Sequence, residues 1–355
     1  MLQDRISAGR GCIDRFGVDA ILFLNLSNIR YLTGFTGSDG AFILSKDHGF
    51  FLTDSRYTSQ AEAEVTGFPT VEYRGKLEGI ASALEKIGAR KTGFEAEHTT
   101  VAFFKSLSAA MPDMDLVPLG AELDELRLRK DAGEVATLEK CAAIASAALL
   151  GILDRVRPGA MERDVALALE FAMKQAGADE KAFDFIVASG VRGALPHGRA
   201  SNKIIAAGEL VTIDFGANYD GYNSDETVTV AVGSADARQR EIYSIVKDAH
   251  DKAVEAVKPG VALKELDGIA RGYIDARGYG SYFGHGLGHG VGLDIHEKPT
   301  VSFRGEGVVE EGMVLTIEPG IYIPEWGGVR IEDTVLVTAD GCTTLTKVPK
   351  DLIVL

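Results

Sequence analysis

The sequence predicts an α+β protein in two parts: an α/β domain over residues 1–120 and an internally duplicated α+β domain over residues 121–355. Three observations lead to this prediction. An acidic β-hairpin pattern occurs twice, at 208–230 and 312–337, and a Pro-Gly turn followed by a helical pattern of apolar residues precedes each copy. Before residue 120, short strands alternate with helices, which is typical of a mixed or parallel sheet.

The N-terminal domain is predicted to open with a helix over Leu2–Phe16. Apolar runs then predict strands, and amphipathic patterns predict helices, at these positions: strands 20–25, 41–44, 50–53, 70–73 and 92–94, and helices after Asp54 and over 77–87 and 100–110. The Asp54 side chain is expected to cap its helix. Two prolines predict a linker over 111–120. The Gly- and Thr-rich segment 28–38 is expected to be a loop, either a lid or a plain connection.

The first acidic hairpin is centred on the sequence Asn-Tyr-Asp-Gly at 218–221, whose Asn, Asp and Gly tolerate positive φ. Asp214 and Asp225 lie on its opposite arms. A two-residue turn at 219–220 would place them directly opposite, one at 220–221 would make them diagonal neighbours on one face, and a three-residue turn would separate them. Neighbouring carboxylates repel unless a cation lies between them. The alternative for one hairpin alone is an exposed acidic surface.

The second hairpin repeats this arrangement with Glu318 on one arm and Glu332 on the other. Thr-Ile-Asp at 212–214 aligns with Thr-Ile-Glu at 316–318. Upstream, Arg-Pro-Gly and Lys-Pro-Gly precede two helical patterns, at 165–176 and 263–276, and a Gly follows each pattern at the expected helix end. The resulting pseudo-two-fold symmetry would bring the two acidic hairpins to one central site.

Residues 283–297, between the hairpins, contain three histidines and a series of alternating glycines. The glycines would allow a backbone, a metal or a substrate to approach closely. Of His285 and His289, we expect one to be a metal ligand and the other to have a second role. No dinucleotide-binding spacing of glycines fits this segment.

Four carboxylates and one imidazole make a hard, oxygen-rich site. Two divalent ions would balance the four negative charges, which predicts a two-metal centre. Its ligands suit manganese, cobalt or zinc better than copper. A water bridging two such ions would lose a proton near neutral pH and act as a nucleophile. The predicted chemistry is hydrolysis of an acyl-type bond.

Composition and missing motifs argue against other classes. A net charge of −15 disfavours nucleic acid or an anionic membrane as a partner. The N-terminus carries charges where a signal peptide needs an apolar run, and no stretch approaches the ~20 apolar residues of a membrane span. Three scattered cysteines predict reduced thiols in the cytosol. The sequence has no H-E-x-x-H, G-x-S-x-G or Walker A motif.

Taken together, the motifs resemble those of the pita-bread metallopeptidases, specifically the Xaa-Pro aminopeptidase and prolidase branch. In the C-terminal part they are I-D-F-G at 213–216, G-Y-N-S-D at 221–225, H-G-L-G-H-G-V-G-L at 285–293, T-I-E-P-G-I-Y at 316–322 and G-V-R-I-E-D at 328–333. Residues 28–38 and 52–57 resemble the creatinase-type N-terminal domain of the same family. The resemblance therefore covers essentially the whole chain and implies a pita-bread fold for its C-terminal part.

The resemblance also implies roles for individual residues. The metal ligands would be Asp214, Asp225, His289, Glu318 and Glu332. Glu318 would also shuttle a proton, and His197 would assist proton transfer. His285 and His296 would contact the substrate or stabilise the tetrahedral intermediate. Arg330 would hold Glu332 or a substrate carboxylate with two parallel hydrogen bonds.

The sequence departs from the family pattern at one position, where Val228 stands in place of the usual arginine. This departure affects a residue that would contact the metal ligands without binding metal itself, and it removes no ligand.

The activity implied by the resemblance is hydrolysis of the Xaa-Pro bond in small peptides with proline at the second position. Such a bond has no N–H and a fixed φ, so it calls for a dedicated enzyme. An aminopeptidase is favoured over a strict dipeptidase (prolidase) by a small margin. A metal-free creatinase-like hydrolase or a non-enzymatic binding module would have lost ligands, and none is missing here. The resemblance further implies a homodimer, and the cysteines indicate a cytoplasmic location.

Overall fold

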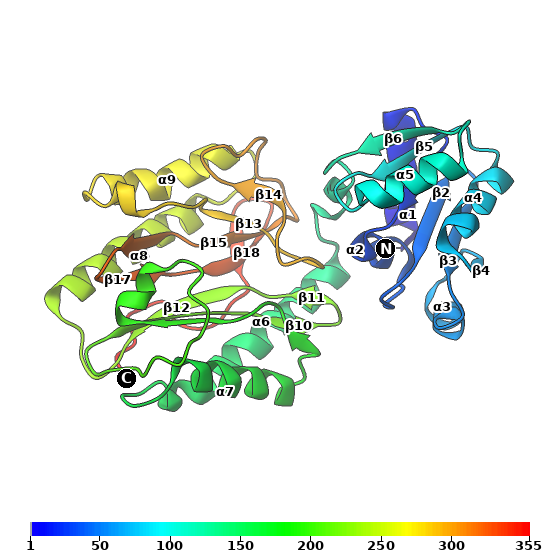
Figure 1. The fold of residues 1–355 in the computed structure, drawn as a ribbon. Coiled ribbons are helices and arrows are strands. Elements are labelled where there is room, and N and C mark those ends of the chain that lie inside the picture. Colours follow the sequence, from blue (N-terminus) through cyan, green and yellow to red (C-terminus); the bar gives the residue numbers. More distant parts are fainter. Residues whose placement is uncertain (1) are drawn as a thin grey trace. The chain divides into compact units, whose positions relative to one another are not determined.

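A computed structural model describes residues 2–355, which divide into two compact units between Arg127 and Leu128. Both units combine helices with sheets, which confirms the predicted α+β class, and Figure 1 shows the elements of each. The domain boundary predicted at residue 120 stays a prediction.

The N-terminal unit is built on a six-stranded mixed sheet in the order β4-β3-β2-β1-β5-β6. Neighbours β1–β2 and β2–β3 are antiparallel and the other pairs are parallel. The strands are β1 (Ala20–Phe23), β2 (Ala41–Ser45), β3 (Gly49–Thr53), β4 (Thr70–Glu72), β5 (Lys91–Glu95) and β6 (Asp115–Leu119). The helices are α1 (Leu2–Phe16), α2 (Leu26–Thr33), α3 (Thr58–Glu64), α4 (Lys76–Ile87) and α5 (Val101–Ala110), followed by the 3-10 turn η1 (Asp124–Arg127).

Three predictions for this unit were wrong. Half of the linker predicted at 111–120 is strand β6, which lies at the edge of the sheet, where Pro118 interrupts no further pairing. The predicted loop at 28–38 begins inside helix α2, which starts after an Asn25 side-chain cap and ends at Gly34 with φ 83°. Asp54 does not cap a helix, because α3 begins later and the Asp54 carboxylate binds Arg56 instead.

The C-terminal unit is duplicated, as predicted. Its first half consists of α6 (Ala132–Ile152), α7 (Glu162–Gln175), β7 (Glu180–Lys181), β8 (Ile186–Ser189), β9 (Leu210–Phe215), β10 (Ala217–Tyr219), β11 (Tyr222–Asn223) and β12 (Glu226–Ala231). The second half consists of α8 (Ala237–Ala256), α9 (Leu263–Asp275), β13 (Gly288–Gly290), β14 (Glu297–Val301), β15 (Val314–Ile317), β16 (Gly320–Ile323), β17 (Gly327–Arg330), β18 (Asp333–Val337) and β19 (Cys342–Thr344). Each half therefore places two helices before an acidic hairpin, with short 3-10 turns η2 (Leu153–Arg155), η3 (Gly190–Ala194) and η4 (Gly280–Tyr282) between elements.

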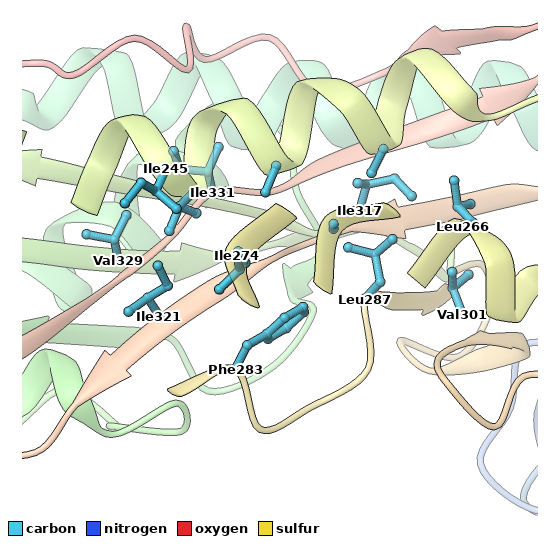
Figure 2. Close-up of a cluster of buried hydrophobic side chains, with 14 of the residues drawn as sticks. Ile245, Leu266, Ile274, Phe283, Leu287, Val301, Ile317, Ile321, Val329 and Ile331 are labelled. Atoms are coloured by element: carbon cyan, nitrogen blue, oxygen red, sulfur yellow. The ribbon is translucent and has the colours of Figure 1, made fainter. Parts of the chain in front are cut away.

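The glycines after α7 and α9 have the positive φ expected at helix ends, 102° at Gly177 and 84° at Gly278. The sheets of this unit are β12-β9-β8, β11-β10-β7, β14-β13-β15-β18-β19 and β16-β17. Figure 2 shows the core of the second half, where Ile245 of α8 and Ile274 of α9 lie with Ile317, Ile321 and Val329 of the hairpin strands. This packing fixes the strands that carry the acidic residues.

One helix among the described residues, Ala132–Arg155, is long and apolar enough to span a membrane by length and composition, although the sequence predicted no such stretch. Half of its most apolar window is buried inside the structure. Ile144, Ala145, Leu149 and Ile152 belong to the core that also contains strands β9 and β12. The apolar residues of α6 thus have a packing role in this unit.

Candidate metal centre

The first acidic hairpin turns at Asp220 and Gly221, whose φ angles are 46° and 70°. Two consecutive positive φ values are typical of a type I′ turn. Asp214 pairs with Thr227 across the ladder, and Asp225 lies two residues before Thr227 on the same strand face. Asp214 and Asp225 are therefore diagonal neighbours, the second of the three arrangements that the sequence left open.

The second hairpin places its acids differently. Ile317 pairs with Asp333 and Gly320 with Arg330, so Glu318 and Glu332 lie opposite each other between these pairs. The hairpins join along their ligand-bearing strands. The Glu332 N–H donates to the Thr227 carbonyl at 3.1 Å, and the Thr334 hydroxyl donates to the Asp225 carbonyl at 2.7 Å. The four acids thus converge, as pseudo-symmetry predicted.

His289 reaches this site on β13 because a glycine stands on each side of it. A Cβ added to Gly288 would lie 1.9 Å from the Thr316 carbonyl oxygen of β15. A Cβ added to Gly290 would lie 2.1 Å from the Lys298 carbonyl oxygen of β14. Only glycine lets the strand fit between its two neighbours, which explains the alternating pattern in the sequence.

Ligand atoms of Asp225, His289 and Glu332 all lie within 4.8 Å of one another. The His289 Nε2 atom is 3.5 Å from Asp225 Oδ2 and 3.5 Å from Glu318 Oε1. Burial lowers the pKa of His289 to about 4, so the ring is neutral. Its Nδ1 lies 2.9 Å from the Gly290 carbonyl and so carries the proton, which leaves the Nε2 lone pair facing two carboxylates. Such an arrangement is favourable only with a cation between the three groups.

The electrostatics of the carboxylates also fit a cation site. Burial raises the pKa of Asp225 and of Glu332 well above the usual range, and the neighbouring acids of the cluster add to both shifts. Burial raises the pKa of Glu318 to about 8. The Asp214 Oδ1 atom is buried and has no hydrogen-bond partner within residues 2–355. Divalent ions would supply both the missing charge and the missing partner.

Arg330 lies at the centre of the site and binds Asp214. Its Nη2 donates to Asp214 Oδ2 at 2.7 Å through a single contact, whereas the resemblance implied paired hydrogen bonds to Glu332 or to a substrate carboxylate. Thr227 separates Arg330 from Glu332: its hydroxyl accepts from Arg330 Nε at 3.2 Å and donates to Glu332 Oε2 at 2.7 Å. Thr227 therefore links Arg330 to Glu332 by hydrogen bonds.

The three histidines that were not expected as ligands also border the site. The His296 and His289 ring centroids are 4.5 Å apart. Burial, followed by the charge of Arg330, lowers the pKa of His285 to about 4. His197 is exposed, and it lies close enough for its charge to lower the pKa of His285 further. Its neighbour Pro196 accepts a hydrogen bond from Arg330 Nη1 at 3.1 Å.

Sequence reasoning missed three further residues at this site. The Tyr322 hydroxyl lies 2.8 Å from His285 Nε2 and accepts from Arg330 Nη1 at 2.8 Å. Thr227 links Arg330 to Glu332, as described above. Lys350 Nζ contacts Glu226 at 2.5 Å and Asp333 at 3.3 Å, and these acids directly follow Asp225 and Glu332. The sequence did contain a signal for the Lys350 contacts, because each hairpin has two consecutive acids, Asp-Glu at 225–226 and Glu-Asp at 332–333.

Val228 faces away from the site. It pairs with Ile213 and belongs to the hydrophobic core of the first half. The valine in place of the usual arginine therefore changes the face of β12 that packs in the core. The opposite face, which carries Thr227 toward Arg330 and Glu332, is unaffected.

Comparison with known proteins agrees with this geometry. Residues 136–339 match metallopeptidase family M24, and residues 5–129 match the creatinase/prolidase N-terminal domain. The chain therefore belongs to metallopeptidase family M24 and is a metallo-exopeptidase with the pita-bread fold.

The relatives place the chain within that family. An uncharacterized peptidase of Bacillus subtilis is 48% identical over 98% of both chains, and an Xaa-Pro dipeptidase of Pyrococcus horikoshii is 42% identical over 96% of both. Among solved structures, an Xaa-Pro dipeptidase from Bacillus anthracis matches over 100% of both chains, with a TM-score of 0.98 and 44% identity. An X-Pro aminopeptidase from Thermotoga maritima matches over 99% of both chains, with a TM-score of 0.91 and 37% identity.

Proposed function

We propose that this enzyme hydrolyses the Xaa-Pro bond of small peptides with two divalent metal ions. The convergence of three carboxylates, those of Asp225, Glu318 and Glu332, on the Nε2 atom of a neutral His289 is the observation that supports the proposal most directly. The ligands would be Asp214, Asp225, His289, Glu318 and Glu332. Manganese is our first choice because the set holds one imidazole and otherwise oxygen, with cobalt and zinc as alternatives.

When bound, such ions polarise a carbonyl oxygen and lower the pKa of a water molecule to near neutrality. The residues of the chain then have separate tasks. Glu318, beside His289, would accept and pass on the proton. Arg330 holds Asp214 on one side and Tyr322 on the other, which fixes the orientation of both.

The histidines would border the peptide. His285 is neutral, and its Nδ1 lies 2.8 Å from the Gly286 carbonyl, so Nε2 is an acceptor that faces the Tyr322 hydroxyl. His197 is exposed beside it and would exchange protons with the departing amine. His296, next to His289, would contact the substrate carbonyl.

The two possible specificities have different support. The sequence motifs favoured an aminopeptidase by a small margin. The relatives named Xaa-Pro dipeptidase, at 42% and 44% identity, are more similar than the structure named X-Pro aminopeptidase at 37%. We therefore place the dipeptidase first and keep the aminopeptidase as the second candidate. A cytoplasmic location, indicated by the three scattered cysteines, and a homodimer, implied by the family resemblance, complete the proposal.

The test compares Ala-Pro with Ala-Pro-Phe, with Ala-Ala as the control, before and after chelation and again after manganese is restored. A strict dipeptidase cleaves Ala-Pro alone, and an aminopeptidase also cleaves Ala-Pro-Phe. Chelation should abolish activity and manganese should restore it. Full activity in the chelated enzyme, or equal cleavage of Ala-Ala, would contradict the proposal.

A further inference from the structure

Two fully buried carboxylates outside the metal cluster bind the segments that carry His197 and His285. Glu162 is the first residue of α7, and Asp267 lies one turn into α9; both side chains are inaccessible to solvent. A buried carboxylate is costly unless it is paired and fully hydrogen-bonded. Arg192 pairs with Glu162 and Arg271 with Asp267.

Glu162 joins both ends of the segment that contains His197. Its Oε1 accepts from the Ser189 N–H and hydroxyl, each at 2.8 Å. Its Oε2 accepts from the Ser201 N–H at 3.1 Å and hydroxyl at 2.7 Å, and from Arg192. Arg192 also donates through Nη2 to the Arg199 carbonyl at 2.8 Å, two residues after His197. One carboxylate thus closes residues 189–201 into a fixed loop.

Asp267 and Arg271 hold the main chain of His285 itself. Asp267 accepts two hydrogen bonds from the guanidinium, at 2.7 and 2.8 Å, and one from the Leu287 N–H at 3.1 Å. The same guanidinium donates to the His285 carbonyl at 2.7 Å and to the Phe283 carbonyl at 2.8 Å. The planar fork of arginine can make these contacts together, whereas the single ammonium of lysine cannot.

We propose that Glu162–Arg192 and Asp267–Arg271 are positioning pairs, the first for His197 and the second for His285. Within residues 2–355, no hydrogen bond or ion pair joins either pair to a proposed metal ligand, so each acts through the histidine that its loop carries. The two acids occupy different positions on the second helix of each half, Glu162 at the start of α7 and Asp267 one turn into α9. The sequence repeat therefore does not align them. The kinetic part of the test rests on the proposed function of these histidines, and the spectroscopic part does not.

The experiment uses Arg192→Lys and Arg271→Lys in the full-length enzyme, loaded with diamagnetic zinc for the NMR measurement and with manganese for turnover. Both variants keep a positive charge beside the buried acid. They replace the planar guanidinium, whose nitrogens reach several acceptors, with a single ammonium nitrogen that cannot reach them all. The imidazole NMR signals of ¹⁵N-histidine-labelled protein are assigned with His197→Ala and His285→Ala. Arg271→Lys should move the His285 signal and leave the His197 signal in place, and Arg192→Lys should do the reverse. Metal content should stay unchanged in both variants.

Turnover provides the second readout. Each lysine variant should lower kcat by roughly 10- to 100-fold, the range expected when a catalytic group is misplaced by about 1 Å. The effect of Arg271→Lys should vanish when His285 is already alanine and persist when His197 is alanine; Arg192→Lys should show the opposite pattern. Should a lysine variant not fold, the double variants Glu162→Gln/Arg192→Gln and Asp267→Asn/Arg271→Gln repeat the measurement, because they remove the buried charge together with its partner.

The outcomes separate the two proposals. The positioning role would be overturned if the His197 and His285 signals both moved, or both stayed in place, in either lysine variant. It would also be overturned if each lysine variant lowered kcat by the same factor in the His197→Ala and His285→Ala backgrounds as in the unmodified enzyme. If the signals respond as expected while His197→Ala and His285→Ala turn over normally, the positioning pairs stand and the proposed roles of the histidines fail.

Discussion

At Asp214, one carboxylate oxygen is bonded to Arg330, and the other is buried with no partner among residues 2–355. An unpaired buried acceptor costs about 1–3 kcal/mol. Asp225 and Glu332 have raised pKa values for a related reason, because burial and nearby acids disfavour their charged forms. A cation bound among these oxygens would relieve both costs, which supports the proposal that these residues bind metal.

Asp225→Asn tests this at a single position. The amide removes one negative charge from the cluster with almost no change in volume, so the fold should persist and metal should be lost. We expect metal affinity to fall by more than the roughly 10- to 100-fold typical of residues behind the ligands, measured as bound manganese after dialysis. The matched control is Asp220→Asn in the turn of the same hairpin, where Asn also accepts a positive φ. Full metal content in Asp225→Asn would contradict the assignment.

His197→Ala should separate proton transfer from metal binding. His197 is exposed and touches the site through its charge and through the Pro196 carbonyl, so its removal should lower kcat by roughly 10²- to 10⁴-fold. Metal content should match that of the unmodified enzyme and of His48→Ala, a control at an exposed histidine in the N-terminal unit. A parallel loss of metal would instead make His197 a ligand.

At the scale of the elements, the sequence predicted those features that depend on residues close together in the chain. The hairpins, their acids and the glycine-capped helices α7 and α9 follow from turn residues and periodicity. The relative position of Asp214 and Asp225 needed the structure, because it depends on which two residues of 218–221 adopt positive φ. Helix α8 was missed although its capping box, Asp236 with Gln239, is readable in the sequence. Strand β6 was missed because edge pairing, which tolerates Pro118, is not a local property.

Gly288→Ala tests how β13 places His289. The added Cβ would lie 1.9 Å from the Thr316 carbonyl, so β13 and β15 must separate and His289 must move. We expect metal affinity and the thermal midpoint of unfolding both to fall. The control is Gly268→Ala in α9, whose Cβ would meet nothing within 4 Å and should raise stability by about 0.5–1 kcal/mol. Unchanged metal affinity in Gly288→Ala would show that the close strand packing is not needed for the ligand.

At the scale of the whole C-terminal unit, the site depends on contacts between the two halves. Lys350 joins Glu226 of β12 to Asp333 of β18, and Thr334 reaches the Asp225 carbonyl. The sequence could identify the repeated acids but not these partners, which come together only when the halves pack. The same limit applies to Tyr322, which lay within a recognised motif but whose contacts with His285 and Arg330 required the fold.

The metal-free enzyme should become less stable as pH rises. Glu318 has a pKa of about 8 when folded against an ordinary value of 4.5, so between these values the folded state binds more protons than the unfolded state. The free energy of unfolding should then fall as pH rises from about 6.5 to 8, above the range in which the lowered pKa values of His285 and His289 act in the opposite sense. Thermal unfolding of chelated protein between about pH 6.5 and pH 8 measures this. Manganese should stabilise most at the high end, and Glu318→Gln should flatten the metal-free profile. Identical profiles with and without metal would contradict the prediction.

The most direct measurement is anomalous diffraction at the manganese edge from crystals grown with excess manganese. Two anomalous peaks should lie among the carboxylates of Asp214, Asp225, Glu318 and Glu332, with His289 Nε2 bound to one of them. An absence of peaks at this position, or Asp214 and Glu318 lying too far apart to share the ions, would contradict the two-metal account.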